Sequence, residues 1–231
     1  MRLVRNQIDA DDLVPETFAP SFFSPKFRPL KSRLISAIVF LLKSLVNLIM
    51  KVLSVNVGLP RIVEYNGEPV ATGIYKESVG GRVKVNEFNL AGDAQADLTV
   101  HGGYFKAVYL YPSEHYEFWR EQLPEMDLPF GVFGENLTTT GLLETDVKVG
   151  DRLQIGTAQF IVTQPRQPCF KLGIRFNRAD IIRRFAKSGR SGFYLAIEKT
   201  GELGAGDSVN FVSRELTGES IADVVRRRFN L

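Results

Sequence analysis

The strongest constraint on the fold is a series of short runs rich in branched and aromatic residues, which begins near residue 50. In the first run, Leu53, Val55 and Val57 alternate with polar positions, which is the period of a strand with one buried face. Glycine or Gly-Asp turns separate the later runs, which cover residues 82–88, 105–111, 147–155, 157–163, 193–199 and 208–212. Short strands at this spacing predict a barrel or closed sheet.

Three stretches have helical patterns instead. Ser113 is placed to cap a helix that continues to residue 123, and a proline follows that helix. Asn177 is placed to cap a second helix over residues 178–187. The amphipathic stretch 221–229 predicts a third helix. The expected fold class is therefore α+β, dominated by strands and with a few peripheral helices.

Residues 1–49 differ in composition from the rest of the chain. Residues 1–33 are rich in proline and phenylalanine, which makes them a poor candidate for regular structure. The expected organisation is an N-terminal extension over residues 1–49, a strand-rich domain over residues 50–215, and a C-terminal helix over residues 216–231.

The extension runs into a strongly apolar segment, residues 34–50. This segment is about as long as the shortest membrane span, but Lys43 and Asn47 interrupt it. Three interpretations stay open: a membrane-associated helix, a helix packed on the domain, and an upstream extension without a native role. The third is suggested by residues 50–57, which read as a start methionine followed at once by a strand.

Composition and motifs narrow the function classes. The net charge of +3 is small, and the basic clusters at residues 183–184 and 226–228 lack interleaved aromatics, which argues against a nucleic-acid partner. One cysteine cannot form an internal disulfide, which indicates a reducing compartment and a cytoplasmic location. One cysteine and two histidines cannot build the usual four-ligand structural zinc site. The sequence also lacks P-loop, dinucleotide-binding and nucleophile-elbow motifs.

The single cysteine, Cys169, lies in a segment that points to chemistry. Pro165 and Pro168 restrict the backbone and remove two donors, so the cysteine is held on a stiff, non-helical stretch. Arg166 and Lys171 bring positive charge close in sequence. A nearby cation favours the thiolate, which is the form that attacks electrophiles and binds metals. A buried structural cysteine is the alternative.

A glycine-rich segment covers residues 101–106. Gly102 and Gly103 expose backbone amides, and beside His101 and Lys106 these amides are suited to hold an anion. The alternative is a tight turn with a surface histidine.

Two further polar segments carry weaker signals. Glu135 and Asn136 supply acceptors and amide donors, which is also what an ordinary turn uses. Arg190 lies between small residues in segment 188–194 and is typical of a phosphate cradle. A helix C-terminal turn is the alternative there.

These segments follow one another in a definite order. They are His101-Gly102-Gly103 with Lys106-Ala107-Val108-Tyr109, then Tyr111-Pro112-Ser113-Glu114-His115-Tyr116, Gly134-Glu135-Asn136-Leu137, Gly150-Asp151, Gln164-Pro165-Arg166-Gln167-Pro168-Cys169-Phe170-Lys171-Leu172 and Gly189-Arg190-Ser191-Gly192-Phe193-Tyr194. Together they resemble the MOSC domain, named after the C-terminal domain of molybdenum cofactor sulfurases. The resemblance covers roughly residues 50–215. It points to the stand-alone bacterial branch linked to detoxifying N-hydroxylated bases such as 6-hydroxylaminopurine.

The resemblance implies a β-barrel-like domain that handles molybdenum cofactor, a pterin dithiolene with a terminal phosphate. It implies that Cys169 is the molybdenum ligand or carries a persulfide, and a soft thiolate suits a soft, sulfur-rich metal centre. His101 or His115 is the candidate proton donor, because the unperturbed pKa of histidine lies near neutrality. The candidates for cofactor binding are Arg166, Lys171, Arg190, His101, Lys106, Asn136, Gly102 and Gly103.

Two functions follow as expectations. The first is a molybdenum-dependent oxidoreductase that reduces N–OH to N–H on a small substrate, with electrons from a separate reductase. The second is a carrier of sulfur or cofactor without turnover, which needs a separate sulfur donor protein. No pyridoxal-phosphate lyase domain precedes the MOSC region, so no pyridoxal phosphate is expected. The bacterial branch usually continues into a three-helix domain, whereas residues 221–231 suffice for one helix.

Overall fold

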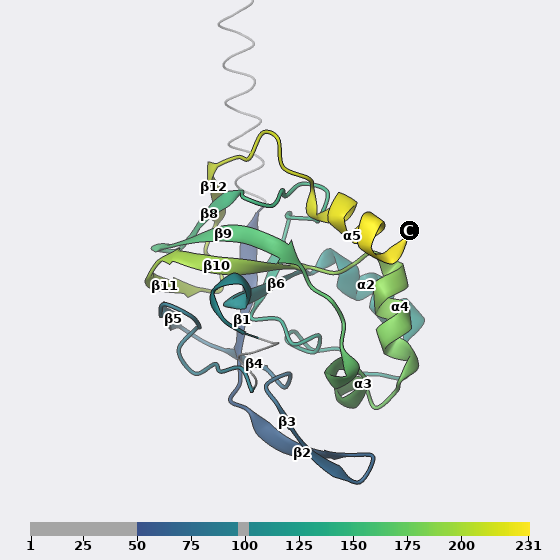
Figure 1. Cartoon of the computed structure of the whole chain (residues 1–231). Coiled ribbons are helices and arrows are strands. Elements are labelled where there is room, and N and C mark those ends of the chain that lie inside the picture. Colours follow the sequence, from purple (N-terminus) through teal and green to yellow (C-terminus); the bar gives the residue numbers. More distant parts are fainter. Residues whose placement is uncertain (1–49, 97–101) are drawn as a thin grey trace, which may run out of the picture. The chain divides into compact units, whose positions relative to one another are not determined.

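The structure of the protein is a computed structural model that describes residues 50–96 and 102–231 (Figure 1). The predictions for residues 1–49, including nearly all of the apolar segment, lie outside the described residues, and so does the prediction for His101. Within the described residues, no helix is both long and apolar enough to cross a membrane.

Strands dominate the described part of the chain, which confirms the predicted fold class. One sheet contains eight strands in the order β12-β8-β9-β10-β6-β7-β1-β4, and there are two two-stranded sheets, the hairpin β2-β3 and the long-range pair β5-β11. The strands are β1 (Lys51–Val57), β2 (Arg61–Tyr65), β3 (Glu68–Thr72), β4 (Glu77–Val79), β5 (Arg82–Val85), β6 (Val108–Pro112), β7 (Leu137–Thr140), β8 (Arg152–Ile155), β9 (Ala158–Pro165), β10 (Phe193–Lys199), β11 (Gly201–Gly204) and β12 (Val209–Ser213).

The large sheet curls back on itself. β1, the first strand along the chain, pairs with β4 and β7 near one end of the strand order. The N-terminal end of β1 also forms hydrogen bonds with the start of β12 and the residues before it, although β12 lies at the opposite end of the strand order. Val209 N donates to Met50 O at 2.9 Å and Val52 N donates to Asp207 O at 2.9 Å. Closure of this kind satisfies backbone groups that an open sheet edge would expose.

One pair of neighbouring strands in the sheet, β6 and β7, is parallel. Parallel neighbours need a crossover connection, and α2 (Glu114–Gln122) provides part of it. The prediction of this helix is confirmed: Ser113 is its N-cap and Leu123 its C-cap, although the Ser113 side chain makes no capping hydrogen bond.

The other helices are the 3₁₀-helix η1 (Tyr104–Lys106), α3 (Phe170–Phe176), α4 (Asp180–Ser188) and α5 (Ile221–Phe229). The predicted C-terminal helix is confirmed as α5, where the Ser220 hydroxyl accepts from Asp223 N. The prediction that Asn177 caps the second helix is wrong. Asn177 has a φ of 49° and ends α3 instead, so α4 begins only after Ala179.

Two other predictions about local structure need correction. The strand expected over residues 105–111 begins only at Val108, because η1 occupies its first positions. The helix α3, which starts directly after Cys169, was not predicted.

The helices α2 and α4 cover the sheet next to an aromatic core (Figure 1). Trp119 of α2 and Phe185 of α4 stack with ring centroids 5.9 Å apart, and the Trp119 indole donates to the Tyr111 hydroxyl at 2.7 Å. The aromatic side chains of these two helices therefore belong to the core. This core holds β6 and β10 in place, and Tyr109 and Tyr194 of these strands reach the pocket described next.

Candidate functional site

One pocket brings together Cys169 and four other predicted site residues. Arg166, Lys171, Lys106 and Asn136 line it together with the cysteine. Gly102 and Gly103 are not among the lining residues; they precede η1, the short helix that carries Lys106.

Cys169 lies between the end of β9 and the start of α3. The chain leaves the sheet after Pro165, and Arg166 N still donates to Gly192 O at 3.4 Å. Cys169 then adopts an extended conformation, with φ of −128° and ψ of 174°, and its carbonyl accepts from Leu172 N at 2.9 Å. Its side chain is half-buried and lines the pocket. The stiff, non-helical segment is as predicted, and the alternative of a fully buried cysteine is not what the structure shows.

Arg166 is the most deeply buried cation of the pocket, with 5% of its surface exposed. Its guanidinium carbon lies 5.1 Å from the ring centroids of both Tyr109 and Phe185. Burial acts to lower the pKa of Arg166, but nearby Tyr109, Tyr194 and Cys169 raise it above its usual value, so the side chain is a cation. Its Nη1 is buried and lacks a hydrogen-bond partner among the described residues. A buried donor without a partner is expensive, which indicates that a ligand group completes it.

The described lining of the pocket carries four cationic side chains and one carboxylate. The cations are Lys76, Lys106, Arg166 and Lys171, and the carboxylate is Asp93. Asp93 forms a buried ion pair with Lys76 and accepts from Gly58 N at 3.0 Å, so it is already occupied. The surplus of positive charge makes the pocket suited to an anionic ligand.

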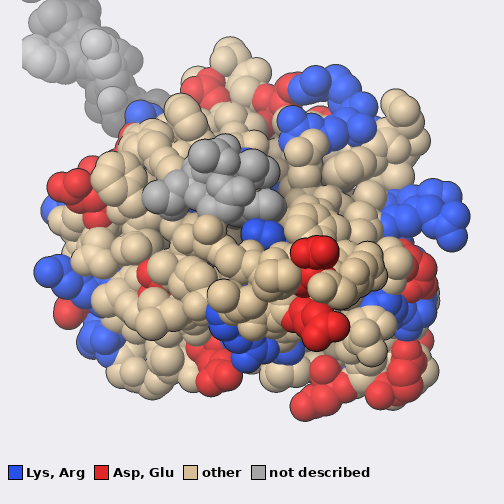
Figure 2. Space-filling view, turned by 60° about the horizontal axis from the view of Figure 1, so that its bottom comes forward, with Lys and Arg blue, Asp and Glu red and all other residues tan. Residues whose placement is uncertain are grey.

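This surplus of positive charge does not extend over the face of the protein drawn in Figure 2. On the face drawn in Figure 2, basic and acidic side chains are interspersed.

Asn136 lines the pocket, but its polar atoms are used within the protein. Its Oδ1 accepts from Tyr109 N at 3.0 Å, and its Nδ2 donates to Asp93 at 2.9 Å and to Asn56 O at 3.3 Å. Only 3% of its surface is exposed. These contacts tie β1, β6 and the Asp93 loop together, so Asn136 fixes the wall of the pocket.

The neighbouring Glu135 is also structural. It is fully buried and accepts hydrogen bonds from Gly131 N at 2.8 Å, Phe133 N at 3.1 Å and Thr138 Oγ1 at 3.0 Å, and also from the Tyr116 hydroxyl. Burial raises the pKa of Glu135, although these donors oppose the shift. The turn interpretation of this segment fits these contacts.

Four ionisable lining residues were not predicted as site residues. They are Lys76, Asp93, Tyr109 and Tyr194. Burial raises the pKa values of the Tyr109 and Tyr194 phenols, and Arg166 opposes both shifts, so the two phenols are protonated near neutral pH. Both tyrosines lie in segments of the MOSC resemblance, which is a signal that could have found them. Lys76 and Asp93 lie outside those segments.

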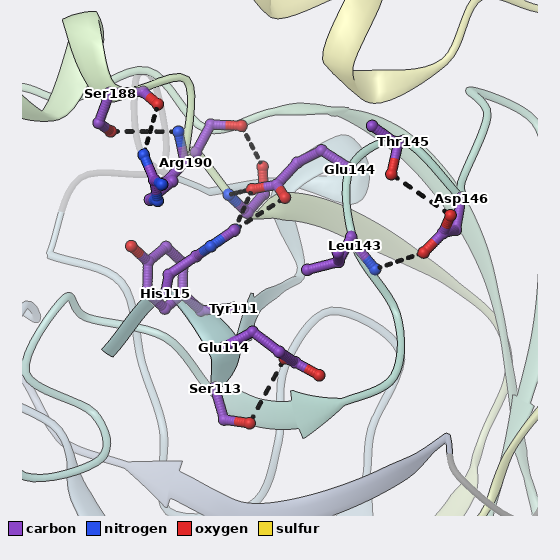
Figure 3. Close-up of polar contacts among 12 residues, drawn as sticks. Tyr111, Ser113, Glu114, His115, Leu143, Glu144, Thr145, Asp146, Ser188 and Arg190 are labelled. Carbon is purple, nitrogen blue, oxygen red and sulfur yellow. Dashed lines mark hydrogen bonds and ion pairs between the residues drawn. The ribbon is translucent and has the colours of Figure 1, made fainter. Parts of the chain in front are cut away.

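His115 and Arg190 lie in a second pocket, which Figure 3 shows in close-up. His115 is buried, and its Nε2 lies 2.8 Å from Glu144 Oε2. The Arg190 guanidinium stacks 3.8 Å from the Phe118 ring centroid and donates to Ser188 O at 3.2 Å. The structure therefore does not bring either residue to Cys169. Gly189, with φ of 69°, ends α4 and directs Arg190 to Phe118, which agrees with the helix C-terminal interpretation.

The turn at Ser191 and Gly192 connects the two pockets. Glu144 Oε1 accepts from Gly192 N at 2.6 Å on the side of the second pocket (Figure 3). On the other side, Gly192 O accepts from Arg166 N, and Ser191 O accepts from the Tyr109 hydroxyl at 2.8 Å. The buried Glu144 thus supports the wall that carries Arg166 and Tyr109.

Comparisons with known proteins show the family of the chain. The family model of the MOSC domain matches residues 97–210. The chain is 41% identical to YflK of Bacillus subtilis over 170 residues, which is 74% of this chain and 76% of YflK. The chain belongs to the MOSC domain family, as the resemblance predicted. It is similar to stand-alone bacterial members such as YflK and YiiM of Escherichia coli, to which it is 39% identical over 64% of this chain and 66% of YiiM.

A solved structure and a longer relative complete the comparison. The crystal structure of YiiM from Geobacillus stearothermophilus superimposes with a TM-score of 0.64 at 33% identity, covering 78% of this chain and 84% of that one. A protein of Gibberella moniliformis named as a reductase is 36% identical over 163 residues, which is 69% of this chain but only 29% of that protein.

Proposed function

We propose that the protein binds molybdenum cofactor in the Cys169 pocket and reduces N-hydroxylated compounds such as 6-hydroxylaminopurine. The observation that carries the proposal is the position of a half-buried thiol beside Arg166, whose buried Nη1 has no hydrogen-bond partner among the described residues. The family is associated with this cofactor, and one relative of the chain carries the name reductase.

The residues of the pocket fit the cofactor chemically. A thiolate is a soft ligand of the kind that molybdenum in a sulfur-rich centre prefers. Arg166, Lys106 and Lys171 supply charge-assisted donors for a terminal phosphate and a pterin, and Nη1 of Arg166 gains the partner it lacks. The bound cofactor supplies the two-electron chemistry that converts N–OH and two protons to N–H and water.

The chain itself holds and orients the reactants. Cys169, which directly precedes α3, would hold the metal, while the Lys76–Asp93 ion pair and the hydrogen bonds of Asn136 fix the pocket lining. The electrons come from a separate reductase protein. We place the protein in the cytoplasm, because its one cysteine has to stay reduced.

A carrier function is the second candidate. The observation that favours it is the extended backbone and partial exposure of Cys169, which suit transfer of a persulfide or of intact cofactor to a partner. In this function a separate sulfur donor protein loads the cysteine.

Elemental analysis combined with a turnover assay distinguishes the reductase from the carrier. We expect protein purified from a host that makes molybdopterin to contain near-stoichiometric molybdenum and to consume 6-hydroxylaminopurine only when a reductase and its electron source are supplied. Persulfide on Cys169 in metal-free protein, with no consumption of substrate, would support the carrier instead.

The substitution Arg166→Lys tests the anion site directly. We expect it to weaken cofactor binding by about 1.5–3 kcal/mol, because a lysine keeps the charge but loses the planar donor pair. The measurement is the partition of limiting cofactor between the variant and the wild type, read from pterin fluorescence.

Arg190→Ala is the matched control for Arg166→Lys, because Arg190 also stacks on an aromatic ring but lines the second pocket. Its affinity for cofactor should equal that of the wild type. Equal losses in the two variants would show that the Cys169 pocket is not the binding site.

A further inference from the structure

Two arginines share one aromatic ring beside the Cys169 pocket. The guanidinium carbon of Arg61 lies 3.4 Å from the centroid of the Tyr75 ring, and that of Arg175 lies 5.0 Å from the same centroid. Arg61 is the first residue of β2, and Arg175 lies in the last turn of α3. Arg61 and Arg175 are far apart in the sequence, but both guanidinium groups contact the Tyr75 ring.

The charge of this pair is not balanced within the described residues. The ion pairs of the described part of the chain include neither Arg61 nor Arg175. The Nε of Arg175 is, in addition, buried without a hydrogen-bond partner. Two like charges near one ring repel each other, and a buried donor without a partner is costly, so an anion that binds beside these guanidinium groups relieves both features.

The pair continues the positive charge of the pocket. Lys171, which lines the pocket, lies four residues before Arg175 on α3, so the two side chains share one face of the helix. On the other side, Ile74 and Lys76 line the pocket and are the chain neighbours of Tyr75. The basic groups therefore form a strip that leads away from Cys169.

The β2–β3 hairpin keeps Arg61 at this strip. Tyr65, at the other end of β2, contacts Phe170, the residue after Cys169, with ring centroids 5.9 Å apart. The hairpin thus contacts α3 directly at Tyr65, and Arg61 at the other end of β2 shares the Tyr75 ring with Arg175 of α3. Figure 1 shows the hairpin and α3 at the same end of the protein.

We propose that Arg61 and Arg175, held on Tyr75, form a phosphate subsite for a ligand that also occupies the Cys169 pocket. A guanidinium presents paired donors that match phosphate oxygens, and two of them suit a doubly charged group. The proposal rests on the proposed function for the identity of the pocket's ligand. Two sources supply such a phosphate: an N-hydroxylated substrate that is a nucleoside monophosphate, and a cofactor extended by a nucleotide.

The first test uses binding to cofactor-free protein. Calorimetric titration with AMP and with adenosine measures the contribution of the phosphate, and we expect AMP to bind at least about tenfold more tightly. Arg61→Ala and Arg175→Ala should each remove most of this difference. Arg120→Ala should leave it unchanged, because Arg120 also lies over a tyrosine, Tyr116, but at another place.

Equal affinity for AMP and adenosine in the wild type would overturn the subsite. So would a preference for AMP that both variants retain. Neither result depends on molybdenum or turnover, so failure of the subsite and failure of the proposed function are distinguishable.

The second test identifies the source of the phosphate. A higher kcat/KM for the monophosphate of hydroxylaminopurine riboside than for the riboside, lost in Arg175→Ala, assigns the subsite to the substrate. The subsite is assigned to the cofactor if two results are found together. The two kcat/KM values are equal, and the protein retains a nucleotide-extended pterin in an amount that is lower in Arg175→Ala. If the cofactor-loaded protein shows neither effect, the proposal is overturned.

Discussion

Cys169→Ser is expected to fold like the wild type and to lose its molybdenum. The side chain is half-buried and the substitution changes one atom, so the free energy of unfolding should change by less than about 1 kcal/mol. A serine hydroxyl stays protonated at neutral pH and is a hard ligand, so it does not replace a thiolate on a soft metal centre. Metal content per protein should fall from near-stoichiometric to background, while thermal unfolding stays the same.

Gln167→Ala is the control for the cysteine substitution. Gln167 lies in the same segment, lines the same pocket and carries no charge, so its variant should retain the metal. Full molybdenum content in Cys169→Ser would contradict the assignment of the sulfur as a ligand. It would leave Arg166 and the lysines as the groups that hold the cofactor.

The local parts of the site could be predicted from the sequence because short-range chemistry determines them. Pro165 and Pro168 fix their own φ and restrict the residues before them, Gln164 and Gln167, so the non-helical course of the segment that leads to Cys169 follows from local chemistry. The long strands β1 and β10 show clear apolar patterns for the same reason.

The remainder of the pocket depends on long-range pairing. Lys76 and Asp93 are 17 residues apart and meet only because two loops pack against each other, and no local pattern distinguishes them from surface charges. Gly73 shows how close those loops lie, since a Cβ there would approach Ala94 O within 2.6 Å. Pairing of this kind is a property of the folded chain.

The motifs of the MOSC resemblance also led to two site residues being placed wrongly. Arg190 and His115 lie in segments of the MOSC resemblance, but they line the second pocket rather than the pocket of Cys169. The helix C-terminal interpretation was correct, because Gly189 does end α4. The place of the Arg190 side chain depends on its contact with the Phe118 ring, which is a long-range contact.

Some shorter elements had weak or overlooked signals. β7, Leu137–Thr140, consists of one leucine and three threonines, so apolar alternation does not mark it. Asn66 and Gly67 form the turn between β2 and β3 with positive φ at both positions, and Asn-Gly is a strong hairpin signal. The hairpin that carries Arg61 was nevertheless not among the predicted strands.

Gly192→Ala is expected to destabilise the protein by about 3–5 kcal/mol and to lower cofactor retention with it. Gly192 has a φ of 60°, and an added Cβ would lie 2.4 Å from Leu110 O and 2.8 Å from atoms of both Tyr109 and Tyr111. Strain at positive φ and overpacking in a buried site each contribute on the order of 1–3 kcal/mol. Because Gly192 O accepts from Arg166 N, a shifted turn also moves the anion-binding arginine.

Gly67→Ala separates the two contributions. Its φ of 83° imposes similar backbone strain, but nothing lies within 4 Å of the added Cβ, so its loss should be only about 1 kcal/mol. Urea unfolding measures both variants, and pterin fluorescence after gel filtration measures the cofactor that each retains. Gly67→Ala should retain cofactor fully, since its turn lies at the far end of the hairpin from Arg61. Equal stability losses in the two variants would mean that the Ser191–Gly192 turn is not closely packed between the pockets, and normal retention in Gly192→Ala would show that Arg166 does not depend on it.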